Sequence, residues 1–367
     1  MVRRAALDAA VSADVAVGTD VAVGTDVAVL DAPVGRRTGT VPGRGAAVLR
    51  LVRRRLLWTV PLVALVSLAV FALAAASPTD AAAAFLGARD EFTGGAARER
   101  VEQLVAGTRW FDAWWGWVSG MPTGDLGVST TARTPVVDVV AGRLPWTLLL
   151  MVLGLGVGAL AAVPLALLAA RSPRGVVARV LTSGLWALSA VPAFVVAMGL
   201  VAVLALGLGW LPTGGLTDPG APVGPGQVGR HLVLPVLSVA LAQVPWITLH
   251  LFRAMTVQLH SPATAAARLR GVPERRVLTR HVLPPAAVPT LAIAGARLPE
   301  VVAGSVLVEE IFSWPGLGQS LVAAALAQDF ALLATATVLL TVVAVLGGLL
   351  ADLCLVRIDP RTDPDGL

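Results

Sequence analysis

Two charged groups stand out in a chain that is otherwise strongly apolar. Arg297 and Glu300 lie three residues apart within one apolar run, so on a helix they share a face and can form an ion pair. A charge at the centre of a bilayer costs about 2.5–3.5 kcal/mol on insertion scales, so such residues are functional by default. Two interpretations stay open: contacts on a substrate path, or a structural ion pair buried against a neighbouring helix.

The second group is the arginine-dense segment from Ala265 to Pro284, which reads AAARLRGVPERRVLTRHVLP between two apolar runs. Gly271 suits the left-handed turn that ends a helix, and Pro273 suits the first turn of a second helix. Glu274 would lie favourably at the N-terminal dipole of that second helix. This order of small residues, glycine and proline predicts a cytoplasmic helix–turn–helix that binds a soluble partner. The alternative is that the arginines only set membrane topology.

The absence of lysine from the whole chain excludes several kinds of chemistry. A P-loop needs a lysine to reach nucleotide phosphates, and a pyridoxal enzyme needs one for its Schiff base. Cys354 is the only cysteine, so no intrachain disulfide and no cysteine zinc site is possible. The four histidines lack metal-ligand spacing, and no Ser-His-Asp arrangement can be placed. We therefore predict no enzyme activity, no catalytic residue, no metal site and no cofactor bound by this chain.

Composition places the chain in a membrane. Hydrophobic residues make up 56% and charged residues 14%, with a mean hydropathy of +0.79, whereas soluble domains are about half apolar and a quarter charged. We expect an all-α polytopic membrane protein, because six apolar runs are long enough to span. They are Leu56–Ala76, Leu144–Ala170, Val180–Gly209, Leu232–Phe252, Pro285–Val308 and Ala331–Ala351. Pro164 and Pro192 predict kinks in the second and third runs.

Arginine placement orients the six expected helices. The segment before the first helix is arginine-rich, and the loop from Arg171 to Arg179 has three arginines and no acid. The loop from Arg253 to Arg280 has six arginines and one acid, whereas residues 309–330 hold three acids and no arginine. By the positive-inside rule both ends of the chain lie in the cytoplasm. The net charge of +5 then reflects topology and not nucleic-acid binding.

Three segments lie outside the expected helices. Residues 1–49 contain a short repeat, and we expect a disordered low-complexity tail, with a mis-assigned start codon as an equal alternative. The external loop 77–143 holds a tryptophan cluster that predicts a helix at the membrane interface, with a ligand site as the alternative. Residues 363–367 form a C-terminal tail. A signal peptide is the alternative for the first apolar run, but that run exceeds the usual apolar core of about 7–15 residues.

The pattern Ala265-Ala266-Ala267-x-x-x-Gly271, followed by His281-x-Leu283-Pro284, resembles the EAA loop of permease subunits in ATP-binding-cassette importers. Ala265 stands where that motif has Glu and His281 where it has Ile, and both departures are familiar in the branch that imports dipeptides and oligopeptides. Other stretches resemble that branch in order and spacing. They are Arg54–Trp58, Gly124–Gly127, Gly142–Leu148, Leu208–Gly215, Glu309–Gly318 and Asp359–Arg361.

The resemblance implies a permease domain over residues 50–362 in a bacterial cytoplasmic membrane. A second, related but distinct permease subunit would complete the path, and an extracytoplasmic binding protein would deliver the substrate. Two cytoplasmic ATPase subunits would hold ATP and Mg²⁺ and grip the hairpins. The implied coupling residues are Ala265, Ala266, Ala267, Gly271, Arg275, Arg276, Arg280, His281, Leu283 and Pro284. The path candidates are Arg297, Glu300 and Glu309, although similar permeases tend to have uncharged residues at the first two positions.

Two other functions stay open on the sequence alone. An ion-gradient-driven secondary transporter is one, although that class tends to show broken helices and inverted repeats, and no such repeat is visible. A membrane scaffold without transport activity is the other. The sequence does not identify the substrate, because dipeptides, longer peptides, nickel complexes and glycosides all fit permeases of this kind.

Overall fold

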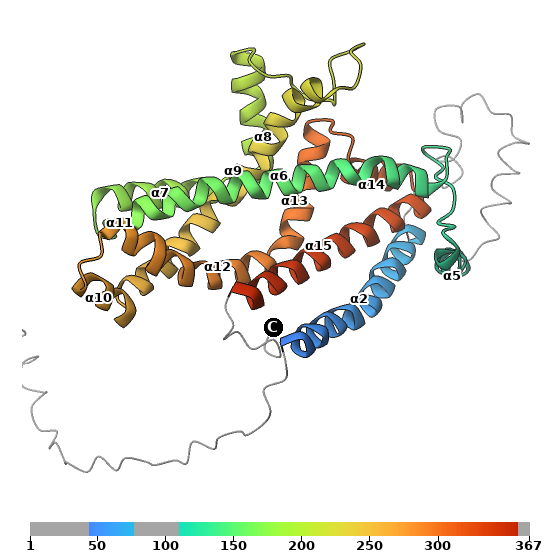
Figure 1. Ribbon diagram of the computed structural model, residues 1–367. Helices are drawn as coiled ribbons and strands as arrows, with labels where there is room; N and C mark the ends of the chain where they lie inside the picture. Colours follow the sequence, from blue (N-terminus) through green and yellow to red (C-terminus); the bar gives the residue numbers. More distant parts are fainter. Residues whose placement is uncertain (1–43, 77–109, 359–367) are drawn as a thin grey trace, which may run out of the picture. The chain divides into compact units, whose positions relative to one another are not determined.

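The computed structural model describes residues 44–76 and 110–358, and within these ranges the chain forms helices and no strand (Figure 1). A single isolated bridge joins Val128 to Pro135. The expected all-α membrane class is confirmed. The predictions for residues 1–43, for residues 77–109 of the external loop and for the C-terminal tail lie outside the described residues.

Five helical stretches in the described part of the chain are long and apolar enough to span a bilayer. They are α2 (Arg44–Ala75), α6 (Val136–Ala170), α9 (Pro225–Leu259), the stretch Glu274–Ala296 and α15 (Phe330–Ile358). A bent pair of helices supplies a sixth candidate, so each predicted run has a counterpart. The boundary predicted at residue 50 falls inside α2, which begins at Arg44.

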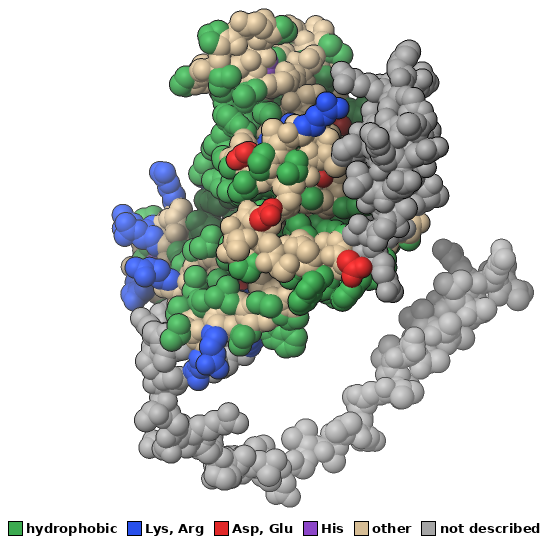
Figure 2. Space-filling view, turned by 90° about the vertical axis from the view of Figure 1, so that its right-hand side faces the viewer, with side chains coloured by type: hydrophobic (Ala, Val, Ile, Leu, Met, Phe, Trp, Pro, Cys, Tyr) green, Lys and Arg blue, Asp and Glu red, His purple; other side chains and the backbone are tan. Residues whose placement is uncertain are grey.

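Apolar side chains cover much of the face shown in Figure 2. On the spans themselves, Leu65 is 65% exposed and Leu160 is 76% exposed. Large apolar side chains in such numbers are unfavourable in water and suit contact with lipid. The surface therefore agrees with a chain embedded in a membrane.

The third apolar run forms two helices at nearly a right angle, where the sequence predicted one kinked helix. α7 (Val176–Ser189) meets α8 (Ala193–Leu200) at 99°, and α8 continues as the π-helix η3 (Val201–Gly207). Pro192 causes the break, because proline lacks a backbone N–H and disfavours helical geometry at the preceding residue. Its backbone is extended at the start of α8, with φ −57° and ψ 141°. Pro164, by contrast, lies inside the unbroken α6.

The fifth apolar run is also broken. α12 (Leu283–Ala296) and α13 (Leu298–Ile311) are separated at Arg297, whose φ of −93° and ψ of 0° lie in the bridge region of backbone space. Pro299, at the start of α13, cannot donate the hydrogen bond that would continue α12. The intramembrane charges predicted from sequence therefore lie at a helix break.

α6 and α9 pack along each other and α2 packs along α15 (Figure 1). Small residues allow the first of these contacts. A Cβ placed on Gly154 would come within 2.5 Å of Cγ1 of Val239, and one on Gly158 within 3.3 Å of the carbonyl oxygen of Ala240. Close approach of helix backbones is the usual role of small residues in membrane helices. Gly156 faces away, because a Cβ there meets nothing within 4 Å.

Because Gly154 is packed and Gly156 is open, the same substitution at the two positions should have different effects on stability. Gly154→Leu is expected to destabilise the purified protein by about 1–3 kcal/mol, since overpacking a filled interface costs that much. Gly156→Leu introduces the same side chain on the open side of α6 and should leave stability nearly unchanged. Thermal unfolding of both variants in detergent measures the difference. Equal melting temperatures would show that Gly154 does not set the α6–α9 distance.

α5 (Trp110–Gly120) attaches to α2 and α15 through its tryptophans. Trp117 is buried and its Nε1 donates to Oγ1 of Thr335 at 3.2 Å, while Nε1 of Trp114 donates to Oγ of Ser67 at 3.1 Å. The predicted helix is present, and part of its aromatic cluster packs against the spans. Its place at the membrane interface stays a prediction.

Candidate functional site

The segment from Ser261 to Val282, here called the hairpin, folds as helix, turn and helix. It consists of α10 (Pro262–Leu269), α11 (Glu274–Arg276) and the π-helix η4 (Val277–Val282). Oγ of Ser261 accepts a hydrogen bond of 3.3 Å from the backbone N–H of Thr264, which caps α10. Gly271 has φ +73°, the left-handed conformation that its position after a helix predicts.

An ion pair closes the hairpin across its turn. Arg268 donates from Nε and Nη2 to the two carboxylate oxygens of Glu274, at 3.1 and 2.7 Å. Its Nη1 also donates to the carbonyl oxygen of Leu259, at the end of α9, at 3.3 Å. The hydrogen bond to Glu274 raises the pKa of Arg268. From the sequence, Glu274 was expected only to interact with the N-terminal dipole of the second helix, and its contact with Arg268 was missed. The opposite charges of Arg268 and Glu274 on either side of the turn could have indicated this ion pair.

The inner face of the hairpin packs onto the chain itself. Ala267 and Val277 are fully buried, in a cluster that includes Ala166 of α6 and Met255 of α9. Ala267 therefore faces the chain itself, and its part in the coupling to ATPases stays a prediction. Ala267 follows buried Thr264 by three residues, so both lie on the inward face of α10.

The outer face of the hairpin has no cover from the described residues. Leu269, the last residue of α10, is 90% exposed. The exposed members of the predicted set are Ala265, Ala266, Gly271, Arg275, Arg276, Arg280 and Pro284, whereas His281 and Leu283 are half-buried. Leu269 was not singled out from the sequence, because an apolar residue in a short helix is normally expected to be buried in the core.

A cavity of about 490 Å³ lies among α7, α8, α9 and α13. Arg297 and Glu300 both line it and form an ion pair, with Nε of Arg297 donating to Oε2 of Glu300 at 2.9 Å. The guanidinium of Arg297 also lies over the ring of Trp246, 5.0 Å from its centroid. Both side chains are partly exposed, so the pair is open to the cavity. The sequence predicted the pairing, and the structure adds the aromatic partner.

Glu309 lies on α13 but is enclosed elsewhere. Its side chain is fully buried, and its Oε2 accepts a hydrogen bond of 3.1 Å from the backbone N–H of Gln319. A Cβ on Gly318 would come within 2.8 Å of that oxygen, and one on Gly316 would collide with the carboxylate. The carboxylate sits inside the turn between α13 and α14 (Leu317–Leu326) and does not line the cavity of Arg297 and Glu300, so a place for Glu309 on the substrate path stays a prediction.

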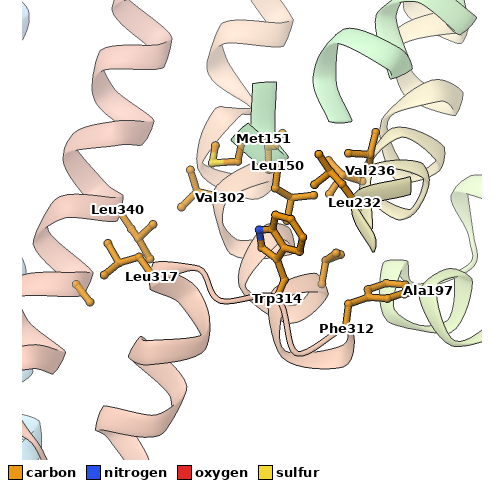
Figure 3. Close-up of a cluster of buried hydrophobic side chains, with 14 of the residues drawn as sticks. Leu150, Met151, Ala197, Leu232, Val236, Val302, Phe312, Trp314, Leu317 and Leu340 are labelled. Atoms are coloured by element: carbon orange, nitrogen blue, oxygen red, sulfur yellow. The ribbon is translucent and has the colours of Figure 1, made fainter. Parts of the chain in front are cut away.

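The same turn carries the largest fully buried side chain of the described residues, that of Trp314. Figure 3 shows Trp314 among apolar side chains that include Leu150 and Leu232, with Phe312 close by. Nε1 of Trp314 donates to the carbonyl oxygen of Trp146 at 3.2 Å. Burial of Trp314 and Phe312 against residues of α6 and α9 fixes this turn to the two helices.

Comparison with known proteins adds an independent line of evidence. The family model for the binding-protein-dependent transport system inner membrane component matches residues 162–364, which include the hairpin and the cavity. The oligopeptide transport system permease protein AppB of Bacillus subtilis is 31% identical over 312 residues, covering 84% of this chain and 98% of the relative. The glutathione transport system permease protein GsiC of Escherichia coli K12 is 30% identical over 315 residues, covering 85% and 98%.

A third relative, the oligopeptide transport system permease protein OppB of Haemophilus influenzae, is 27% identical over 246 residues, covering 67% of this chain and 78% of the relative. These relatives are transport permeases and not enzymes. The matches favour a transport permease over the scaffold that the sequence left open. The chain therefore belongs to the family of binding-protein-dependent transport system inner membrane components, as a multi-pass permease of the cytoplasmic membrane.

Proposed function

We propose that this chain is the membrane-spanning permease subunit of an ATP-driven importer of peptides. Its relatives are named for oligopeptide and glutathione transport, and they match it over nearly their whole length. Both chain ends lie in the cytoplasm, in agreement with the arginine-rich loops. The substrate passes through the cavity beside α13, where Arg297 and Glu300 supply polar contacts.

The hairpin is the docking element for separate ATPase subunits. The observation that carries this assignment is its asymmetry: one face is buried in the chain and the other, with Leu269 and five arginines, is exposed. The ion pair of Arg268 with Glu274 links α10 to α11 across the turn. An element with an uncovered apolar tip suits a protein partner.

Motion of the hairpin reaches the cavity through a short, continuous route. η4 passes directly into α12, and the helix break at Arg297 joins α12 to α13. A break in a helix can act as a hinge because few backbone hydrogen bonds cross it. When ATP binding draws the ATPases together, the hairpin moves with them and α13 changes the access of the cavity.

The remaining partners follow from this arrangement. ATP and Mg²⁺ reside on two cytoplasmic ATPase subunits, because a lysine-free chain cannot form a P-loop. A second, related permease completes the path from the other side. An extracytoplasmic binding protein delivers the peptide.

Uptake by the reconstituted importer tests this function. The chain, its partner permease, its ATPases and the binding protein are placed in liposomes, with a labelled tripeptide outside and ATP enclosed. We expect uptake that requires ATP and is unaffected by an uncoupler, because no ion gradient drives it. Uptake that an uncoupler abolishes, or that needs no ATP, would assign the chain to another class of transporter.

A further inference from the structure

A second arginine of the cavity has no role in the site described so far. Arg253 lines the cavity from α9 and has no carboxylate partner among the described residues. Its guanidinium lies over the ring of Trp186 of α7, 5.2 Å from the centroid. A cation on an aromatic face is held in place while its N–H edge stays free to bind. Arg253 is thus a positioned but unneutralised charge.

Arg253 belongs to a stripe that runs along one face of α9. The stripe begins at Gln243 and continues three, seven and ten residues later with Trp246, His250 and Arg253. All four side chains line the cavity. Such spacing places side chains on one helix face. Two internal contacts order the stripe: Nε1 of Trp246 donates to Oε1 of Gln243 at 2.6 Å, and the rings of Trp246 and His250 meet edge to face.

The charges on this cavity favour an anionic group at one end. Glu300 offsets Arg297, whereas nothing in the described part of the chain offsets Arg253. A guanidinium offers parallel N–H donors that match a carboxylate in a bidentate pair. A cavity of about 490 Å³ with aromatic walls is of the size that takes a small organic ligand. A short peptide with a free C-terminal carboxylate meets both requirements.

We propose that Arg253, held against Trp186, binds the C-terminal carboxylate of the peptide in transit and makes the permease itself selective for peptides with a free C-terminus. This inference rests on the proposed function as a peptide importer. It gives Arg253 a part in specificity that is separate from the Arg297–Glu300 pair. The pair lies at the start of α13, lines the same cavity and remains available to the rest of the peptide.

The test compares two substrates in the complete importer. Trialanine and its C-terminal amide are each supplied to proteoliposomes that carry the wild-type chain or Arg253→Gln. We expect Arg253→Gln to lower uptake of the free acid about tenfold, the effect of losing one charge-assisted hydrogen-bonded pair. Uptake of the amide should hardly change. The binding protein is the same in every sample, so its own preference cancels when variants are compared.

Three controls separate specificity from folding. Arg253→Lys keeps the charge over Trp186 but loses the bidentate fork, and should give intermediate uptake of the free acid. Arg179→Gln removes an exposed arginine of α7 that does not line the cavity, and should change neither substrate. The rate of ATP hydrolysis by each reconstituted complex shows whether the subunits are assembled.

The possible outcomes distinguish failure of carboxylate binding by Arg253 from failure of the proposed peptide import. If the wild type imports neither peptide, the proposed function fails and the inference fails with it. If Arg253→Gln lowers uptake of acid and amide equally, Arg253 supports the fold or binds a lipid phosphate, and the inference is wrong while peptide import stands. Unchanged uptake of both substrates would overturn the inference in the same way.

Discussion

Replacing Leu269 with glutamate is expected to uncouple the importer while leaving the permease folded. Leu269 is 90% exposed at the tip of α10, so its removal disturbs no contact within the described chain. Exposed substitutions of this kind change stability by no more than about 0.5 kcal/mol. An apolar anchor buried in a partner is worth about 2 kcal/mol or more, which is roughly a thirtyfold loss of affinity. ATPase co-purification and ATP-driven uptake should both fall accordingly.

Leu326→Glu is the matched control. Leu326 is 83% exposed and ends α14, which lies far along the bundle from α10 (Figure 1). This variant makes the same chemical change and should retain its ATPases. If Leu269→Glu co-purifies with the ATPases as the wild type does and still drives uptake, the tip of the hairpin is not the contact.

Adding one methyl group at Gly316 is expected to destabilise the protein by about 1–3 kcal/mol, the usual result of overpacking. The backbone of Gly316 is extended, with φ −88° and ψ 176°, so alanine suffers no backbone strain there. The nearest obstacle is the buried carboxylate of Glu309, with which the new Cβ would collide. Thermal unfolding of the purified chain in detergent measures the loss.

A double-mutant cycle identifies the obstacle. Glu309→Ala removes the carboxylate, so Gly316→Ala should cost less in that background than in the wild type. Gly226→Ala is the control for the glycine replacement itself, because a Cβ at Gly226 meets nothing within 4 Å. Additive losses in the cycle would mean that Glu309 is not the reason for glycine at position 316.

The features that the sequence predicted well are those that depend on near neighbours in the chain. Gly271 and Pro273 determine the turn of the hairpin through their own backbone preferences, and both lie where expected. Arg297 and Glu300 pair because they are three residues apart. Apolar runs located the spans because a bilayer sets their length.

The features that escaped prediction depend on residues far apart in the sequence. The stacking of Arg253 on Trp186 joins two helices, and the enclosure of Glu309 by Gly316 depends on how the α13–α14 turn folds back. The right angle at Pro192 shows the same limit, since proline predicts a disturbance of the helix but neighbouring helices set its size. Burial of Ala267 likewise required knowing what α10 packs against.

Cross-linking from the hairpin tip tests most directly the claim that separate ATPases move this chain by the hairpin. Cys354 is first replaced by alanine, and Leu269→Cys then carries the sole thiol for a short bifunctional cross-linker in the assembled importer. We expect a product of this chain with an ATPase subunit, at a yield that changes when ATP is bound. Efficient ATP-driven uptake with no such product, or an equal product from Leu326→Cys, would contradict it.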